Sequence, residues 1–228
     1  MKLKAIITGA TGMVGKGLLL ECLKDPEVES VLVINRQPVG IQHAKLREVI
    51  HKDFFDLSPV EQELKGYNTG FFCLGVSSVG MSEAEFHRLT YDLTIHVAET
   101  ALRMNPEMAI CYVSGTGTDS SEKGRMMWAR VKGKTENKLL SMPFRDAYMI
   151  RLGFLQPLDG IRSKVGWYSA VYRVTAFLFP LLRLVFPRQM LTTRSLGQAM
   201  IKVVKQGCEL KVLGNSDLNG ILKSAPVS

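Results

Sequence analysis

The chain has 228 residues, of which 46% are hydrophobic and 22% charged, which indicates an ordinary globular protein of one domain with a sizeable core. The formal net charge of +8 favours anionic partners, but Lys and Arg are spread along the chain without a helix-turn-helix, zinc or RNP-type motif. We therefore expect a phosphorylated cofactor as the anionic partner and no specific nucleic acid.

The cysteines indicate a reducing compartment. They are widely scattered and three lie in apolar runs, which is typical of small buried thiols and argues against a disulfide framework or a metal site. The first residues, Met1-Lys-Leu-Lys-Ala5, lead directly into an apolar run, so we expect no signal peptide and a cytoplasmic protein. The cysteines are Cys22, Cys73, Cys111 and Cys208.

The first predicted strand, Leu3 to Thr8, leads into a run with glycine at every third position, Gly9-Ala-Thr-Gly-Met-Val-Gly15. Apolar residues then recur at helical spacing from Met13 to Leu23, which predicts a helix. A strand, a glycine-punctuated turn and a helix form the phosphate-binding corner of a nucleotide-binding fold, because the N–H groups of the helix N-terminus face the phosphates. The alternative is a glycine-rich turn without a ligand.

Each glycine of this run has a predicted task. Gly9 permits a tight turn, Gly12 lets the backbone approach a pyrophosphate, and Gly15 lets the helix lie close to the sheet. The spacing differs from the commoner G-x-G-x-x-G, but its place between a strand and a helix favours dinucleotide binding. The predicted cofactor contacts in this turn are Gly9, Thr11, Gly12, Met13, Val14 and Gly15.

The end of the second predicted strand, Ser30 to Asn35, indicates which dinucleotide binds. About 20 residues beyond the glycines, NAD-binding proteins place an acidic residue on the adenosine ribose. This chain has Asn35-Arg36 there, and a guanidinium suits a 2′-phosphate, which a carboxylate would repel. We therefore expect Asn35 and Arg36 to contact NADP, with NAD the weaker ligand; the alternative is that Arg36 only extends along the surface.

Strands and helices alternate up to about residue 152, which predicts an α/β fold, a doubly wound parallel sheet of the Rossmann type. A long helix is expected from Glu83 to Met104, with Ser82 and Glu85 spaced as a capping box. His87 and His96 on this helix are interpreted as surface residues, because neither has a second metal ligand at helical spacing. The remaining predicted strands are 48–51, 70–75, 108–114 and 146–152, and the remaining predicted helices are 59–64, with Ser58 as its cap, and 122–140.

Beyond residue 157 the pattern changes, so we predict a dinucleotide-binding core over 1–157 and a small, mostly helical C-terminal lobe over 158–228 that completes the same domain. Residues 165–187 are apolar and aromatic, but Arg and Pro residues interrupt them, so no membrane-spanning helix is expected. This segment covers the substrate end of the sheet, contacts a second copy or another partner, or lies on a membrane surface. A helix over 192–204 and a closing strand over 209–213 follow.

Six short segments in a fixed order carry a family resemblance: Gly9–Gly15, Asp53-Phe54, Phe72-Cys-Leu-Gly75, Val113-Ser114, Val131-Lys-Gly133 and Arg151-Leu-Gly-Phe-Leu155. Through them the chain resembles the atypical short-chain dehydrogenase/reductases, in particular the branch similar to the Tat-interacting protein. The resemblance extends to about Pro157 and fades in the last third of the chain. It implies a Rossmann fold, a nicotinamide dinucleotide cofactor and oxidoreductase activity.

The resemblance also implies roles for individual residues. Asp53 would lie near the adenine with its side chain, and Phe54 with its backbone. Ser114 would occupy the catalytic serine position, and Lys132 would hold the nicotinamide ribose. The other implied cofactor contacts are Leu74, Gly75 and Val76 at the middle of the dinucleotide and Leu152, Gly153, Phe154 and Leu155 along the nicotinamide.

One departure concerns the family's catalytic pair, Tyr-x-x-x-Lys, whose side chains share a helix face. Here Trp128 stands in the place of the tyrosine before Lys132. An indole N–H donates a hydrogen bond but cannot act as a titrating acid, so the proton must come from water, the substrate or another phenol, with Tyr168 the candidate. Two alternatives stay open: Ser114 as a turn-forming serine and Lys132 as an exposed helix lysine.

Two functions follow from these residues. The first is an NADP-dependent oxidoreductase for a small carbonyl or alcohol, in which Ser114 orients the substrate and Lys132 the ribose. The second is a protein without activity that binds NADPH as a structural or sensing ligand and acts through a partner. Trp128 favours the second function, and the retention of Ser114 and Lys132 favours the first. No residue pattern identifies the substrate.

Overall fold

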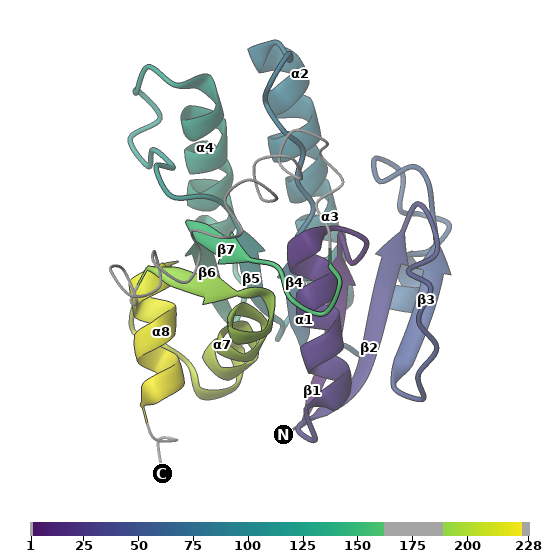
Figure 1. Cartoon of the computed structure of the whole chain (residues 1–228). Coiled ribbons are helices and arrows are strands. Elements are labelled where there is room, and N and C mark those ends of the chain that lie inside the picture. The colour runs from purple at the N-terminus through teal and green to yellow at the C-terminus, as the bar shows by residue number, and fades with distance from the viewer. Residues whose placement is uncertain (1, 162–188, 225–228) are drawn as a thin grey trace.

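A seven-stranded parallel sheet forms the centre of the computed structural model, which describes residues 2–161 and 189–224 (Figure 1). Its strands lie in the order β3-β2-β1-β4-β5-β6-β9, so the chain winds from β1 toward one edge and then from β4 toward the other. This order confirms the predicted doubly wound sheet. The strands are β1 (Leu3–Thr8), β2 (Val28–Asn35), β3 (Leu46–Ile50), β4 (Thr69–Phe72), β5 (Ala109–Val113), β6 (Asp146–Arg151) and β9 (Val212–Gly214).

Helices cover both faces of the sheet, as Figure 1 shows. Successive residues of a strand point to opposite faces, so Ile7 packs in the cluster beneath α1 and α7 while Ile6 packs in the cluster beneath α3 and α4. Both faces are apolar, which is why the inner strands appear as continuous apolar runs. The helices are α1 (Met13–Lys24), α7 (Thr193–Gln206) and α8 (Asn215–Lys223) on one face, and α2 (Glu83–His87), α3 (Leu93–Met104) and α4 (Met127–Ser141) on the other.

Helices α1 and α7 approach closely because a glycine lies on each side of their contact. A Cβ on Gly17 would lie 2.7 Å from the Cβ of Thr193, and a Cβ on Gly197 would lie 3.1 Å from the Cγ of Glu21. The buried carboxylate of Glu21 accepts a hydrogen bond of 2.8 Å from the side chain of Gln198. The C-terminal part of the chain therefore packs against the helix that follows the glycine-rich turn.

The helix predicted from Glu83 to Met104 contains a π-helical turn, Arg88–Asp92, between α2 and α3. At its start the hydroxyl of Ser82 accepts the N–H of Glu85 at 3.3 Å, and the carboxylate of Glu85 accepts the N–H of Ser82 at 2.9 Å. The predicted capping box is therefore confirmed.

The predicted start of the helix over 122–140 is wrong, because α4 begins at Met127. The carboxylate of Asp119 accepts the backbone N–H groups of Ser121 and Gly124, which folds the preceding residues into a loop. Within that loop Glu122 has a φ of 60°, in the left-handed region that a right-handed helix excludes.

The helix predicted over 59–64, with Ser58 as its cap, is also wrong at its start. Only a single 3₁₀ turn, Glu61–Leu64, forms there. The carboxylate of Asp56 accepts both the N–H and the hydroxyl of Ser58, so Ser58 belongs to a side-chain turn and does not cap a helix. Leu64 alone of this 3₁₀ turn is buried in the core.

The C-terminal part of the chain completes the main sheet, because β9 pairs with β6 at its edge. A separate parallel pair, β7 (Phe154–Gln156) with β8 (Met190–Thr192), was not predicted, since three residues are too few to show a period. The apolar segment 165–187 and Tyr168 lie outside the described residues, so their roles stay predictions. Among the residues described, no helix is long and apolar enough to span a membrane.

Candidate functional site

The predicted site residues come together at one edge of the sheet. Gly9 follows β1, Arg36 follows β2 and Gly75 follows β4, while Ser114 directly follows β5 and Leu152 directly follows β6. These five strands are parallel neighbours, so their carboxyl ends meet at the same edge. The topology therefore assembles one continuous candidate site from segments that lie far apart in the sequence.

The glycine-rich turn has the backbone geometry of a phosphate cradle. Gly9 has a φ of +75°, and a Cβ there would lie 2.6 Å from the carbonyl oxygen of Cys73. A Cβ on Gly15 would overlap the carbonyl of Gly9, so only glycine lets α1 begin so close to the turn. Gly12 is the N-cap of α1 with no side-chain cap, and the first turn has no acidic residue. The helix N-terminus therefore faces the turn without a protein anion, which fits a bound phosphate.

The other residues predicted in this turn lie where a ligand can contact them. Thr11, Met13 and Val14 are half-buried, and the last two pack partly against the core beneath α1. Their backbone belongs to the turn and to the first turn of α1. The structure thus places Thr11, Met13 and Val14 beside the three glycines.

At the end of β2, the structure reveals an acidic residue that the sequence did not suggest. The side chain of Asn35 is only 3% exposed and donates a hydrogen bond of 3.1 Å to Glu48, which lies on β3. The same carboxylate oxygen accepts the N–H of Val39 at 2.8 Å. No local signal could have found Glu48, because only the pairing of β2 with β3 brings it there. Arg36 is exposed, and in the described part of the chain it forms no ion pair.

The predicted adenine contacts differ in their exposure. Asp53 is exposed, and its carboxylate accepts the N–H of Phe55 at 2.9 Å. The side chain of Phe54 is buried in the core beneath α3, so only its backbone is left for a ligand. The ring of His51 lies 2.6 Å from the carbonyl oxygen of Asp53 and braces this loop.

The segment after β4 is open to a ligand along its backbone, whereas the segment after β6 is exposed at two residues but has its backbone hydrogen-bonded within the protein. After β4, Leu74 is half-buried, Gly75 and Val76 are exposed, and a Cβ on Gly75 would meet no atom within 4 Å. After β6, Gly153 and Phe154 are exposed. Their neighbours Leu152 and Leu155 are half-buried and buried, respectively.

Asn215 at the start of α8 holds the segment after β6 in place. Its side chain accepts the N–H of Gly153 at 3.0 Å and donates to the carbonyl of Phe154 at 2.9 Å and to that of Gln189 at 2.7 Å. Because Asn215 lies about 60 residues further along the chain, no local pattern connects it with this site.

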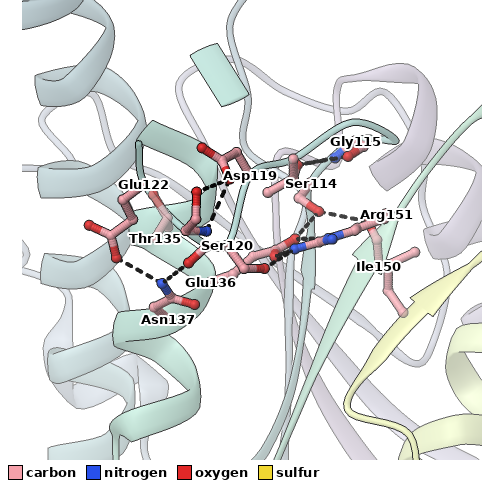
Figure 2. A network of polar contacts seen from close by, with 12 residues as sticks. Ser114, Gly115, Asp119, Ser120, Glu122, Thr135, Glu136, Asn137, Ile150 and Arg151 are labelled. Carbon is pink, nitrogen blue, oxygen red and sulfur yellow. Dashed lines mark hydrogen bonds and ion pairs between the residues drawn. The ribbon is translucent and has the colours of Figure 1, made fainter. Parts of the chain in front are cut away.

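Ser114 lies in a buried polar network (Figure 2). It is 6% exposed, and its hydroxyl lies 2.5 Å from a carboxylate oxygen of Glu136 on α4. Glu136 is 1% exposed and accepts hydrogen bonds from Arg151 at 2.6 and 3.1 Å on one oxygen and 3.2 Å on the other. Arg151 also donates to the hydroxyl of Ser120. A carboxylate can only accept hydrogen bonds, so the Ser114 hydroxyl donates a hydrogen bond to Glu136. The lone pairs of the Ser114 oxygen stay available to a ligand.

Lys132 lies one helical turn before Glu136, on the same side of α4. Its side chain is half-buried, and burial lowers the pKa of its ammonium while the negative charge of Glu136 acts in the opposite direction. The sequence had singled out Ser114 and Lys132. Glu136 bonds to the first and follows the second by one turn of α4. Its position four residues after Lys132 is the signal that could have found it.

Trp128, which the family resemblance sets in the place of the catalytic tyrosine, lies one turn before Lys132 on α4. It is half-buried, and the far edge of its indole faces Gly117, where a Cβ would lie 3.3 Å from the ring. Thr116, the residue before Gly117, is exposed, and its hydroxyl lies 3.3 Å from the carbonyl oxygen of Arg151. Thr116 is a second hydroxyl at this edge of the sheet that the sequence did not single out.

The family can now be stated from comparison with known proteins. Residues 5–125 match the model of the NAD dependent epimerase/dehydratase family. The chain belongs to this family. It is also similar to "Protein FMP52, mitochondrial" of Debaryomyces hansenii, with 26% identity over 97% of this chain and 99% of that one. The resemblance to the short-chain dehydrogenase/reductases is therefore confirmed.

Solved structures agree with this assignment at the level of the fold. An ADP-L-glycero-D-manno-heptose-6-epimerase of Helicobacter pylori superposes with a TM-score of 0.68 at 16% identity, covering 96% of this chain and 80% of that one. A short chain dehydrogenase of Burkholderia cenocepacia, solved in complex with NADP, gives a TM-score of 0.63 at 14% identity, covering 97% and 92%. The family binds nicotinamide dinucleotides, and the glycine turn fits one.

The expectation of a cytoplasmic protein is wrong. The curated relatives that match this chain, from Debaryomyces hansenii, Meyerozyma guilliermondii and Scheffersomyces stipitis, are named as mitochondrial proteins. The scattered free cysteines indicate a reducing environment, but such thiols do not identify one reducing compartment among several.

Proposed function

We propose that the chain is an NADP-dependent oxidoreductase that acts on a small carbonyl or alcohol. The observation that carries this proposal is the joint presence, at one sheet edge, of an uncapped glycine cradle, Ser114 and Lys132. The dinucleotide supplies hydride chemistry when it is bound, and the protein supplies position and electrostatics. Gly9, Gly12 and Gly15 would hold its phosphates.

The reaction end of the site has two hydroxyls with different capacities. Ser114 donates its proton to Glu136, so its oxygen can accept a hydrogen bond from the hydroxyl of an alcohol. Thr116 is exposed and can donate or accept. Lys132 would hold the ribose with a half-buried ammonium, whose hydrogen bonds are stronger than those of a neutral donor. Ser114 and Thr116 orient a substrate without themselves supplying a titrating acid.

The preference for NADP rests on Arg36. It is exposed beside Asn35 and forms no ion pair with any described residue, so it is free to bind a 2′-phosphate. The carboxylate of Glu48 accepts hydrogen bonds from Asn35 and Val39 on one of its oxygens.

Titration calorimetry of the protein with NADPH and NADH tests this preference. We expect NADPH to bind more tightly, and Arg36→Ala to reduce NADPH affinity about tenfold or more, since one charge-assisted hydrogen bond contributes about 1.5–3 kcal/mol. NADH affinity should not change in this variant. Equal affinities of the unaltered protein for both nucleotides would refute the NADP preference.

A second function is favoured by Trp128, which removes the titrating group of the family's pair. In this version the protein binds NADPH through the same cradle and acts on a partner without turnover. The two functions separate in a single assay: a panel of aldehydes, ketones and alcohols with the cofactor shows turnover for an enzyme and none for a sensor.

A further inference from the structure

Glu136 is a buried carboxylate with two cations within reach, and it pairs with only one. Arg151 approaches both of its oxygens, with the shortest distance 2.6 Å. Lys132, one turn away on the same helix, has no ion pair or hydrogen bond with any residue in 2–161 or 189–224. A half-buried ammonium beside a buried carboxylate would be expected to pair with it, so the absence of that pair requires a reason.

The geometry of the network gives that reason. A guanidinium presents a planar fork of donors that matches a carboxylate, whereas an ammonium acts as a point charge. Arg151 lies at the end of β6, and its approach to Glu136 is further braced by its bond to Ser120 (Figure 2). The hydroxyl of Ser114 occupies the remaining side of the carboxylate. With both oxygens of Glu136 already bonded, Lys132 gains little by turning toward it.

We propose that Arg151 is a positioning residue that holds Glu136 away from Lys132 and so leaves the Lys132 ammonium available to a bound nucleotide. In this inference the binding of Lys132 to a nucleotide rests on the proposed function. The pairing of Glu136 with Arg151 and not with Lys132, which we call the division of charge, does not depend on that function. Arg151 adjoins Leu152, which begins the segment predicted to pass the nicotinamide, so the same residue couples that segment to α4. Its own role is exerted through Glu136 and not through contact with the substrate.

The division of charge can be measured without any nucleotide. Burial lowers the pKa of Lys132 and Glu136 opposes this, so that pKa reports how closely Glu136 approaches. The test is NMR titration of the full chain with ¹³C-dimethylated lysines, with the Lys132 signal assigned by its loss in Lys132→Arg. The variants are Arg151→Met, Glu136→Gln and the two combined.

We expect Arg151→Met to raise the pKa of Lys132, because the freed carboxylate turns to the ammonium. Glu136→Gln should lower it, and the double variant should match Glu136→Gln, since no carboxylate remains to be released. NADPH affinity should fall about tenfold in Arg151→Met and recover in the double variant, which a merely structural role of Arg151 would not produce. An unchanged Lys132 pKa in Arg151→Met would overturn the proposal.

Two further variants keep the result interpretable. If Arg151→Met does not fold, Arg151→Lys replaces it, because lysine keeps the charge but lacks the planar fork of the guanidinium. A smaller rise in the Lys132 pKa in Arg151→Lys would support the proposal, and an unchanged pKa would overturn it. Lys132→Met tests the proposed function separately: unchanged NADPH affinity in that variant refutes the ribose-holding role. The division of charge would then still be tested by the NMR titrations of Lys132.

Discussion

The phosphate-binding turn and the Ser114–Lys132 end of the candidate site lie at the same edge of the sheet, but they are built differently. The turn is made by backbone within seven consecutive residues, Gly9 to Gly15, whose glycines permit contacts that a Cβ would block. The other end is made by side chains from β5, α4 and β6, joined through Glu136. The turn can therefore be predicted from a short stretch of sequence, whereas the other end forms only when the strands have paired.

This difference also affects how each end tolerates change. Adding one carbon atom to the turn disturbs backbone that has no room to move. A side chain at the other end can be exchanged while the backbone stays in place. A residue such as the family's catalytic tyrosine is therefore one whose exchange should leave the fold intact.

The largest expected effect comes from restoring that tyrosine. The unaltered protein should reduce aldehydes and ketones only slowly with NADPH, because no titrating acid stands at position 128. Trp128→Tyr places a phenol one turn before Lys132, and a positioned acid contributes ~10²–10⁴-fold in rate. The measurement is NADPH oxidation with a panel of carbonyl compounds.

Trp128→Phe is the matched control, since it opens the same space beside Gly117 without adding a hydroxyl. It should show no gain. A similar gain in both variants would mean that steric relief and not the phenol is responsible. Rapid turnover by the unaltered protein would show that its proton comes from elsewhere.

A smaller effect is expected at the turn. Gly15→Ala introduces a Cβ that overlaps the carbonyl of Gly9, and backbone must shift to admit it. Overpacking of this kind costs about 1–3 kcal/mol, and here it also distorts the phosphate cradle. Urea unfolding should show the lower stability, and calorimetry should show weaker NADPH binding.

Gly220→Ala on α8 is the control for this change, because a Cβ there would meet no atom within 4 Å. Alanine is favoured over glycine within a helix by about 0.5–1 kcal/mol, so this variant should be slightly more stable and bind NADPH normally. If Gly15→Ala bound NADPH as well as the control, close approach at the turn would not be what the glycine provides.

The smallest effect should come from the helix cap that lies outside both ends. Ser82→Ala removes the acceptor for the N–H of Glu85, and such caps contribute about 1 kcal/mol. For a chain of this length that corresponds to a fall of roughly 2–4 °C in Tm, with NADPH affinity unchanged. Ser82→Asp preserves an acceptor and should retain most of the stability. Loss of NADPH binding in Ser82→Ala would show that this helix is coupled to the site.

The sequence by itself determined the doubly wound sheet, the glycine turn and the capping box at Ser82. Each depends on neighbouring residues: apolar runs define strands, helical spacing defines helices, and glycines mark the places where backbone approaches backbone. The helix starts near Ser58 and Glu122 were misjudged because aspartate side chains compete for the same backbone N–H groups.

Only the tertiary structure decided the side-chain connections at the sheet edge. Glu48 reaches Asn35 from an adjacent strand, Asn215 reaches Gly153 from α8, and Glu136 joins Ser114 to Arg151. Such contacts depend on strand order and register, which place residues together regardless of their separation along the chain. The position of Lys132 on a helix was predicted from the sequence. The arginine that we propose keeps Glu136 away from Lys132 is the last residue of β6, and only the fold brings it to α4.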